Sequence, residues 1–500
     1  MSIKIKRIEN PELFFGIVAP IGVDFRGVIE SLGTQLGAFG YNEAVLKVTD
    51  VFENLHPKLS LETDLKNTPL DARLESYISY GDKLREHFDD DSLFAYTSIY
   101  RVMERRKHLR SNSNESTPEK IAYILHQFKR KEEIDILRAV YGRLFFQLSV
   151  YTKRSSRVDI LARKIANSRN SAEHMKYRNT AEYLVIKDED DEFSPHGQRV
   201  GKVFHEADII INTEADVIVE KQVERVVQLI FGSNTLSPTR TEYGLYMAKS
   251  AALRSLDLSR QVGAAIFSPM AEIISLGSNE VPKAGGGTYW CDDPFDDRDF
   301  RRGLDSNYKR KLEILREIYP DGDEITLVKQ FRKSQLMAAL EYGRMIHAEM
   351  SAITDAARLG RPLKGAILFT TTFPCHMCAK HIVAAGIDKV IFLEPYPKSL
   401  ASELHSDSIF IEGQSRENYD KFPSCYFEHF YGISPKRYRD FFERGARKNE
   451  DGTLIKSTNQ PIIDITVPVY LWIESMMLKD VLKPLLNSKD IALNEISEDE

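Results

Sequence analysis

Residues 365–394 read Gly-Ala-Ile-Leu-Phe-Thr-Thr-Thr-Phe-Pro-Cys-His-Met-Cys-Ala-Lys-His-Ile-Val-Ala-Ala-Gly-Ile-Asp-Lys-Val-Ile-Phe-Leu-Glu. Within this stretch, the apolar run 366–372 predicts a strand, residues 375–385 predict a helix, and residues 389–393 predict a second strand. Strands that alternate with helices indicate an α/β domain.

The sequence before this stretch predicts further elements of the same domain. Residues 261–268 and 271–277 are typical of a hairpin of two strands. The helical patterns 305–318 and 326–346 follow, and another helix is expected to begin near His347. The polar segment 232–239 contains Gly and Pro and predicts a linker before the domain.

Four residues of this region form a pattern with a specific chemistry. Cys375 and Cys378 are one helical turn apart, and His347 and Glu349 lie two residues apart at another predicted helix start. One imidazole and two thiolates are a tetrahedral zinc set that leaves the fourth position open for water. Zinc lowers the pKa of that water towards about 7, and Glu349 is then available to move its proton. The order H-x-E…P-C-x-x-C is the signature of zinc-dependent base deaminases.

Two other uses of the cysteines stay open. A lone Cys-x-x-Cys pair is also found in thioredoxin-like redox proteins, although these need no His-x-Glu upstream. A structural zinc would need a fourth protein ligand, and Cys291 or Cys425 could supply it. Cys291 is also a candidate ligand of an accessory second zinc, whereas Cys425 is expected to be a buried apolar residue.

The motifs resemble the cytidine and deoxycytidylate deaminase superfamily over about residues 240–400. The resemblance rests on residues 347–353, 369–380 and 384–393, and on the segments 254–255, 262–266 and 278–282. It implies a mixed sheet sandwiched between helices, with His347, Cys375 and Cys378 as zinc ligands and Glu349 as the catalytic proton shuttle. It also implies that Asn279 binds the sugar of the substrate.

The chain departs from that family in a long insert between Asn279 and His347. The insert includes Trp290, Cys291 and the glycine run 285–287. Glycines let backbone N–H groups approach anions, so this run could close on substrate phosphates. A surface turn is the other interpretation of the run.

The N-terminal half has the pattern of a parallel sheet. Strands are predicted at residues 13–19, 44–48, 121–128, 144–151 and 207–212, and helices at 25–36, 134–141, 157–166 and 217–231. Strands alternating with helices indicate βαβ units. The acidic run 188–192 predicts a solvated loop.

The segment 15–24 follows the first strand and precedes a helix, as a phosphate-binding loop does. Its glycines, Gly16 and Gly22, are the candidate nucleotide contacts, but Val23 and Asp24 stand where a Lys-Ser/Thr pair would fall. Residues 151–157 and 207–212 nevertheless resemble the nucleotide-kinase branch of P-loop folds. An active phosphotransferase, a sensor that binds a regulatory nucleotide, and a scaffold all stay open as roles.

A P-loop kinase-like half joined to a deoxycytidylate-type deaminase resembles the bacterial anti-phage dCTP deaminases, and residues 393–401 and 404–409 support that resemblance. It implies hydrolytic deamination of free deoxycytidine nucleotides, dCTP and also dCMP, which depletes dCTP in antiviral defence. Arg260, Tyr396 and Lys398 are candidate contacts of the substrate. The alternatives are a dCMP deaminase of ordinary pyrimidine metabolism and a polynucleotide cytidine deaminase.

The composition helps to choose between these functions and to predict where the protein is found. The 500 residues carry 68 Lys+Arg and 74 Asp+Glu, a formal net charge of -6, which argues against a protein that coats nucleic acid. No apolar run approaches the roughly 20 residues of a membrane span, and the N-terminus lacks a signal-peptide core. We therefore expect a cytoplasmic homo-oligomer with a P-loop kinase-like domain at residues 1–232 and a zinc deaminase domain with a C-terminal extension at residues 238–485.

Overall fold

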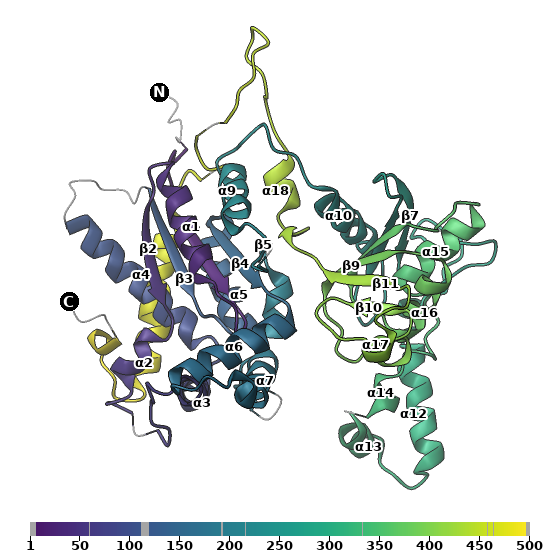
Figure 1. Ribbon diagram of the computed structural model, residues 1–500, viewed down its shortest axis with the longest axis horizontal. Helices are drawn as coiled ribbons and strands as arrows, with labels where there is room; N and C mark the ends of the chain where they lie inside the picture. The colour runs from purple at the N-terminus through teal and green to yellow at the C-terminus, as the bar shows by residue number, and fades with distance from the viewer. Residues whose placement is uncertain are drawn as a thin grey trace. The chain divides into compact units, whose positions relative to one another are not determined.

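The computed structural model describes residues 7–496 except residues 60, 112–119, 192–193, 216, 333, 458 and 464. The chain forms two compact units, of which the first comprises Met1–Ser237 with Tyr431–Glu500 and the second comprises Pro238–Phe430. Each unit has its own six-stranded sheet with helices on it (Figure 1). None of the described helices is long and apolar enough to cross a membrane.

The sheet of the first unit has the order β12-β5-β4-β1-β3-β2. Its first five strands in sequence are mutually parallel, as predicted, and the short β12 is antiparallel to β5. The fully buried β1 lies between β3 and β4, because its six residues are apolar or glycine and both faces are covered. The strands are β1 Leu13–Val18, β2 Asn42–Lys47, β3 Ile121–His126, β4 Phe145–Tyr151, β5 Ile209–Asn212 and β12 Gly432–Ile433.

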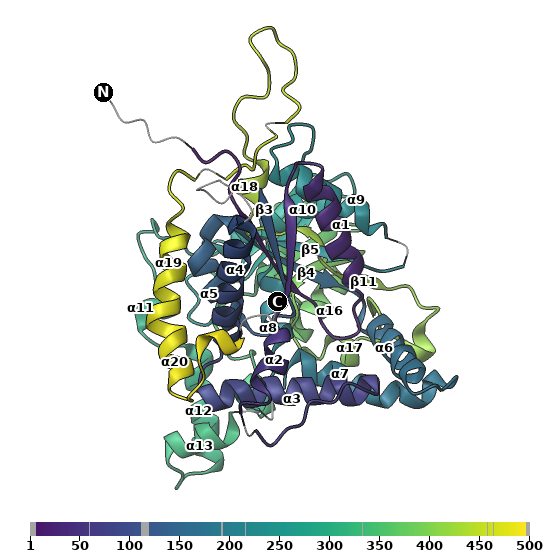
Figure 2. The ribbon, with the colours of Figure 1, turned by 90° about the vertical axis from the view of Figure 1, so that its left-hand side faces the viewer.

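Helices α1 and α9 cover one face of this sheet, and α4 and α5 cover the other (Figure 2). The α-helices are α1 Arg26–Gly37, α2 Asp50–Leu55, α3 Leu70–Phe88, α4 Leu93–Ser111, α5 Lys131–Tyr141, α6 Arg154–Ser168, α7 Arg178–Glu189, α8 Val200–Val203, α9 Val219–Ile230, α18 Tyr438–Phe442, α19 Val469–Met477 and α20 Lys483–Asn487. A π-helical segment, Leu478–Leu482, joins α19 to α20, and short 3-10 turns lie at Gly142–Leu144, His174–Tyr177, Phe204–Glu206 and Leu493–Ile496.

The C-terminal extension belongs to the first unit, whereas we expected it on the deaminase domain as far as residue 485. Its α19 carries Glu474, which is buried and accepts a 2.6 Å hydrogen bond from Arg106 Nη1 on α4. The Nε atom of Arg106 donates to the buried Glu12 at 2.9 Å. Buried carboxylates need charged partners, so this cluster holds the extension against the first unit.

The second unit has a mixed sheet of order β10-β11-β9-β8-β6-β7. The predicted hairpin is present, since β6 is antiparallel to both β7 and β8, while β8, β9, β11 and β10 are parallel to one another. The strands are β6 Gly263–Phe267, β7 Ile273–Ser278, β8 Ile367–Thr372, β9 Lys389–Glu394, β10 Ile409–Ile411 and β11 Cys425–His429. The strand-helix-strand stretch 365–394 is therefore β8, α16 and β9.

Two glycines allow helices to approach the two faces of this sheet closely. A Cβ on Gly263 would lie 2.0 Å from the carbonyl oxygen of Ala248 in α10, and one on Gly277 would lie 2.1 Å from that of Ala348 in α15. Gly263 is paired with Ser278, so the adjacent Gly277 faces the other side of the sheet. The start of α15, which carries Glu349, is therefore pressed directly onto β7.

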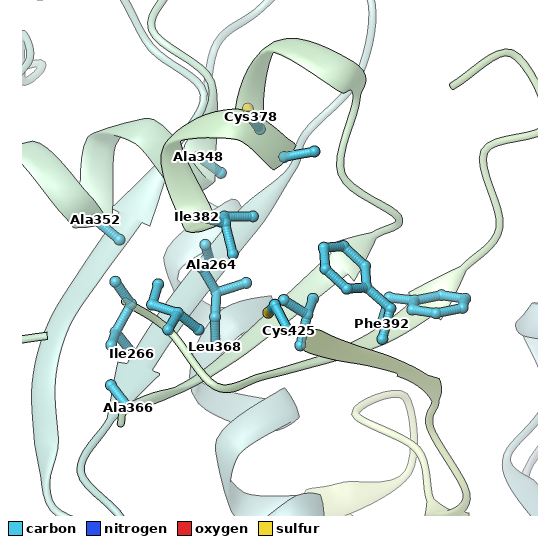
Figure 3. Packing of buried hydrophobic residues seen from close by; sticks show 14 of the residues in the cluster. Ala264, Ile266, Ala348, Ala352, Ala366, Leu368, Cys378, Ile382, Phe392 and Cys425 are labelled. Atoms are coloured by element: carbon cyan, nitrogen blue, oxygen red, sulfur yellow. The ribbon is translucent and has the colours of Figure 1, made fainter. Parts of the chain in front are cut away.

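Small side chains fill the core between the sheet and the helices α15 and α16. Figure 3 shows Ala348, Ala352 and Ile382 from the helices together with Ala264 and Leu368 from the strands. The helices of the unit are α10 Arg240–Ala252, α11 Asp299–Arg302, α12 Ser306–Ile318, α13 Glu324–Phe331, α14 Gln335–Ala338, α15 Ala348–Arg358, α16 His376–Ala384 and α17 Ala401–Leu404, with a 3-10 turn at Glu417–Tyr419.

The predicted helix at 326–346 is wrong. The structure has the short helices α13 and α14 instead, and Ser334 caps the second through a hydrogen bond from the N–H group of Met337. Residues 339–346 are not helical, because Ile346 pairs with Glu280 as a β-bridge. This bridge directs the chain into the start of α15.

Candidate active site

Two helix N-termini bring the three predicted zinc ligands together. His347 is the N-cap residue of α15, and Cys375 is the N-cap residue of α16. The Nδ1 atom of His347 lies 3.3 Å from Sγ of Cys375 and 3.4 Å from Sγ of Cys378. One ligand atom from each residue lies within 4.8 Å of the other two. This donor set fits a zinc ion with its fourth position open to a small ligand.

The surroundings of Cys375 favour the thiolate, the form that binds metal. A hydrogen bond with the Cys378 thiol and then the His347 side chain lower the pKa of Cys375 to about 4, although burial opposes them. The backbone N–H of Cys378 also donates to Cys375 Sγ, at 3.5 Å, because Cys375 caps the helix. Residue spacing and helix geometry thus prepare the site for a cation.

Glu349 lies in the first turn of α15, and its side chain is buried beside the ligand set. Burial, and then the negative charge of Cys375, raise the pKa of Glu349 above its usual range. The hydroxyl of Thr370 on β8 lies 3.4 Å from Oε1 of Glu349 and donates to the carbonyl oxygen of Thr372 at 2.9 Å. A carboxyl group with a raised pKa can both accept and release a proton near neutral pH.

A cavity of about 380 Å³ opens beside these residues. It lies within the size range of small-molecule sites. The structure places all four predicted substrate contacts on its wall together with His347, Glu349 and Cys375; they are Asn279, Arg260, Tyr396 and Lys398.

The buried Asn279 holds the backbone at the edge of the cavity. Its Oδ1 accepts a 2.7 Å hydrogen bond from Val262 N, and its Nδ2 donates to the Arg260 carbonyl oxygen at 2.8 Å. Asn279 therefore fixes the position of Arg260 in addition to lining the cavity.

Two basic side chains, Arg260 and Lys398, line the cavity. The Arg260 guanidinium donates to Glu394 Oε1 at 2.7 Å and lies 5.6 Å from the centre of the Tyr396 ring. Lys398 has no carboxylate within ion-pair distance among the described residues. A nucleotide phosphate is the kind of group that such a pair of cations binds.

The insert supplies an apolar part of the cavity wall that was not predicted from the sequence. Met337, Ala338 and Leu340, from α14 and the residues after it, line the cavity, as does Met345. A further contact joins the insert to the zinc helix, since Glu341 Oε1 lies 3.4 Å from His376 Nε2. The sequence feature that could have indicated this wall is the group of methionine and leucine residues just before His347. The same group is also typical of the buried face of a helix.

The other two cysteines lie apart from the ligand set in the described residues. Cys425 on β11 is buried in the core, and burial raises its pKa to about 12, as expected of an apolar residue (Figure 3). Cys291 is exposed in the insert and belongs to no group of three ligands among those residues. The glycine run 285–287 has positive φ throughout and does not line the cavity; it turns the chain against the Arg358 side chain.

The two glycines proposed as nucleotide contacts lie in different surroundings in the first unit. Gly16 is inside β1, where a Cβ would lie 2.5 Å from Cζ of Phe145, so it makes room for that ring. Gly22 has φ +90° in the loop after β1 and lines a second cavity. Only Gly22 is therefore placed to approach a ligand.

Comparison with known proteins finds matches to the second unit. Residues 238–394 match the family model described as the cytidine and deoxycytidylate deaminase zinc-binding region. The deoxycytidylate deaminase of phage T4 is 33% identical over 161 residues, which are 31% of this chain and 78% of the phage protein.

Two further relatives match shorter or similar lengths of the chain. The deoxycytidylate deaminase of phage T2 is 38% identical over 78 residues, 16% of this chain and 40% of that protein. The probable deoxycytidylate deaminase of Drosophila melanogaster is 30% identical over 175 residues, 33% of this chain and 68% of that protein.

Proposed function

We propose that this chain, which belongs to the cytidine and deoxycytidylate deaminase family, hydrolyses deoxycytidine nucleotides to deoxyuridine nucleotides and ammonia. The observation that carries the proposal is the ligand group of His347, Cys375 and Cys378 beside one cavity. Glu349, Arg260 and Lys398 line that cavity together with two of the ligands. The three ligands would hold a zinc ion, which when bound supplies a water activated at neutral pH.

The protein groups then perform the proton transfers. The Glu349 carboxylate takes a proton from the attacking water and passes it to N3 of the cytosine ring. The oxygen of that water bonds to C4. Its remaining hydrogen is then transferred through Glu349 to the amino group, the C4–N bond breaks, ammonia leaves and a C4 carbonyl remains. The buried position of Glu349, which raises its pKa, suits a group that must hold the proton between these steps.

The cations of the cavity support a nucleotide rather than a nucleoside as substrate. Arg260 and Lys398 line the same wall, and Asn279 ties the backbone of Arg260 to that wall. The net charge of -6 favours a small nucleotide over a polynucleotide, which is usually bound in a basic groove.

We further propose that dCTP is a substrate and that its depletion serves antiviral defence. Support comes from the resemblance of residues 393–401 and 404–409 to the anti-phage dCTP deaminases, and from a second α/β unit whose sequence resembles the nucleotide-kinase branch of P-loop folds. In that unit, five parallel strands have the order β5-β4-β1-β3-β2, and the loop after β1 leads into α1. In cells, the proposal predicts a fall in dCTP during phage infection that depends on Glu349.

A deoxycytidylate deaminase of ordinary pyrimidine metabolism is the second candidate. The similarity to the deoxycytidylate deaminases of phage T4 and Drosophila melanogaster favours deoxycytidylate as the substrate. Product analysis with dCMP, dCTP, CTP and single-stranded DNA separates the candidates. Release of ammonia from dCTP supports the first, turnover of dCMP alone supports the second, and turnover of the DNA alone would contradict both.

A further inference from the structure

A cavity of about 470 Å³ lies within the first unit, beyond the carboxyl ends of three parallel strands. Residues that follow β1, β2 and β3 line it, among them Gly22, Thr49 and Gln127. In the sheet, β1 lies between β3 and β4. The chain therefore continues from β1 to β2 and β3 on one side of β1, and later to β4 and β5 on its other side. Ligands of open α/β sheets bind at this kind of position. Helices α3 and α6, which lie beyond the same end of the strands, complete the wall (Figure 2).

The loop after β1 is already occupied by a carboxylate of the protein itself. The Ile21 N–H donates a 2.7 Å hydrogen bond to Asp188 Oδ2, and the Lys129 ammonium donates to Asp188 Oδ1 at 2.7 Å. Lys129 also donates to the Ala19 carbonyl oxygen at 2.8 Å. Asp188 is fully buried, whereas we predicted a solvated loop at residues 188–192. A negative charge thus stands where the loop would bind a phosphate, and the nearby lysine is neutralised.

The interior of the cavity is largely apolar, and two polar atoms of its wall residues lack hydrogen-bond partners among the described residues. Phe52, Phe94 and Tyr77 are among the residues that line it. Gln198 and Arg85 also line it and are 9% and 3% exposed. Among the described residues, neither Gln198 Oε1 nor Arg85 Nε has a hydrogen-bond partner. Buried polar atoms are nearly always paired, so a ligand that reached these two atoms would have to offer a donor to Gln198 and an acceptor to Arg85.

Unpaired positive charge lies elsewhere on the wall. Lys164 on α6 and Arg73 on α3 have no carboxylate within ion-pair distance among the described residues. The Arg73 guanidinium lies 4.8 Å from the centre of the Tyr77 ring. Both residues are partly exposed, and together they can bind an anionic group.

We propose that this cavity binds a nucleoside monophosphate and performs no phosphoryl transfer. The aromatic wall suits a planar base, and the glutamine side chains offer the amide groups that read the edge of a base. Gln127 accepts from Thr49 through Oε1, which leaves its NH₂ group available. The phosphate lies at Arg73 and Lys164. The loop that would hold a second and third phosphate is closed by Asp188.

Isothermal titration of the full chain tests the proposal. The chain carries Glu349→Gln, so that no probe is deaminated, and AMP, GMP and dTMP are the probes because they lack cytosine. We expect at least one to bind with one site per chain and at least 10-fold more tightly than the corresponding triphosphate. Lys164→Ala and Arg73→Ala each weaken its binding by roughly 10-fold, and Gln198→Leu weakens it similarly.

Arg163→Ala is the matched control, because Arg163 is the exposed neighbour of Lys164 on α6 and does not line the cavity. It leaves the affinity unchanged, and equal thermal unfolding midpoints show that the variants fold. The proposal is overturned if no probe binds, if Lys164→Ala binds as tightly as Arg163→Ala, or if γ-phosphate moves from ATP to any of the probes. These outcomes are independent of deamination, which takes place in the other unit.

Discussion

The Thr370 hydroxyl lies 3.4 Å from Oε1 of Glu349, which lines the cavity together with His347 and Cys375. Thr370 is fully buried on β8, and its proton is directed to the carbonyl oxygen of Thr372. Glu349 therefore lies against a rigid strand, and among the described residues no lysine, arginine or histidine forms an ion pair with its carboxylate. This arrangement leaves the carboxylate available to water and substrate.

Glu349→Gln should reduce ammonia release by between about 10²- and 10⁴-fold, because a carboxamide cannot take the proton of the attacking water. The amide has nearly the same volume, so the fold and the zinc content should stay unchanged. Steady-state ammonia release and metal analysis of the purified protein measure both quantities. Asp355→Asn, at a partly exposed position of the same helix that does not line the cavity, serves as control and should retain full activity. Full activity of Glu349→Gln would contradict the assigned role.

Cys375→Ser should lose both zinc and activity, because a serine hydroxyl does not replace the thiolate whose pKa is about 4 here. Cys291→Ser makes the same chemical change at an exposed cysteine outside the ligand set and should keep both. Metal content per chain, measured beside activity, tests the pair. A Cys375→Ser protein that kept its zinc would show that the ligand set is wrong, and loss of metal in Cys291→Ser would point to an accessory site.

The metal site could be predicted because its geometry is local. Cys375 and Cys378 share one helical turn, and His347 precedes Glu349 by two residues, so the spacing places the side chains within each half of the site. The H-x-E…P-C-x-x-C order is what joined the two halves, which lie 28 residues apart. The α/β pattern of both sheets could be predicted for the same reason, since short apolar runs such as Leu13–Val18 indicate buried strands from neighbouring residues alone.

The features that were missed depend on partners far away in the sequence. Asp188 is buried because Lys129 and Ile21 pair with it, and Glu474 is buried against Arg106 across 368 residues. No local pattern reports such pairs, and an isolated acidic residue in a polar segment is expected in solvent. The apolar wall around Met337 was missed for a related reason. The pattern at residues 326–346 predicts one helix, and no local feature shows that Ile346 instead pairs with the distant Glu280.

Lys398→Ala should raise KM for dCMP or dCTP by roughly 10-fold and change kcat little, since a charge-assisted contact with phosphate is lost. Deoxycytidine carries no phosphate, so its turnover should be the same in the variant and the parent. Lys364→Ala removes an exposed lysine of the same unit that does not line the cavity, and its kinetics should match the parent. An equal loss with deoxycytidine would show that Lys398 acts on the fold rather than on phosphate.

Glu474→Ala should lower the free energy of unfolding of the first unit by about 3 kcal/mol, because it deprives the buried Arg106 of one of its two carboxylates. Glu443→Ala removes one partner of the exposed Arg439–Glu443 pair and should cost less than about 1 kcal/mol. The chain has two tryptophans, and Trp472 lies in the first unit, so urea unfolding of the Trp290→Phe protein followed by Trp472 fluorescence reports this unit. Equal costs for the two variants would rule out the proposed anchoring of the extension.

His126, at the end of β3, should make the first unit less stable as the pH falls. Burial lowers the pKa of His126 to about 4, from 6.5 in the unfolded chain, and its Nδ1 has no partner among the described residues. The neutral form is thus favoured by folding, and the stability it contributes is fully present above pH 6.5 and is lost as the pH falls towards 4. Between pH 7.5 and 5.5 the loss amounts to about 1 kcal/mol.

The comparison must be made between variants, because Asp82 acts in the opposite direction. Burial raises the pKa of Asp82 to about 7, so its contribution stabilises the folded unit as the pH falls through the same range. His126→Gln removes only the contribution of this histidine. Between pH 7.5 and 5.5, the unfolding free energy of the variant should therefore fall by about 1 kcal/mol less than that of the parent. His174→Gln, in a short turn of the same unit, should follow the parent. If His126→Gln also followed the parent, protonation of His126 would not be what destabilises the fold.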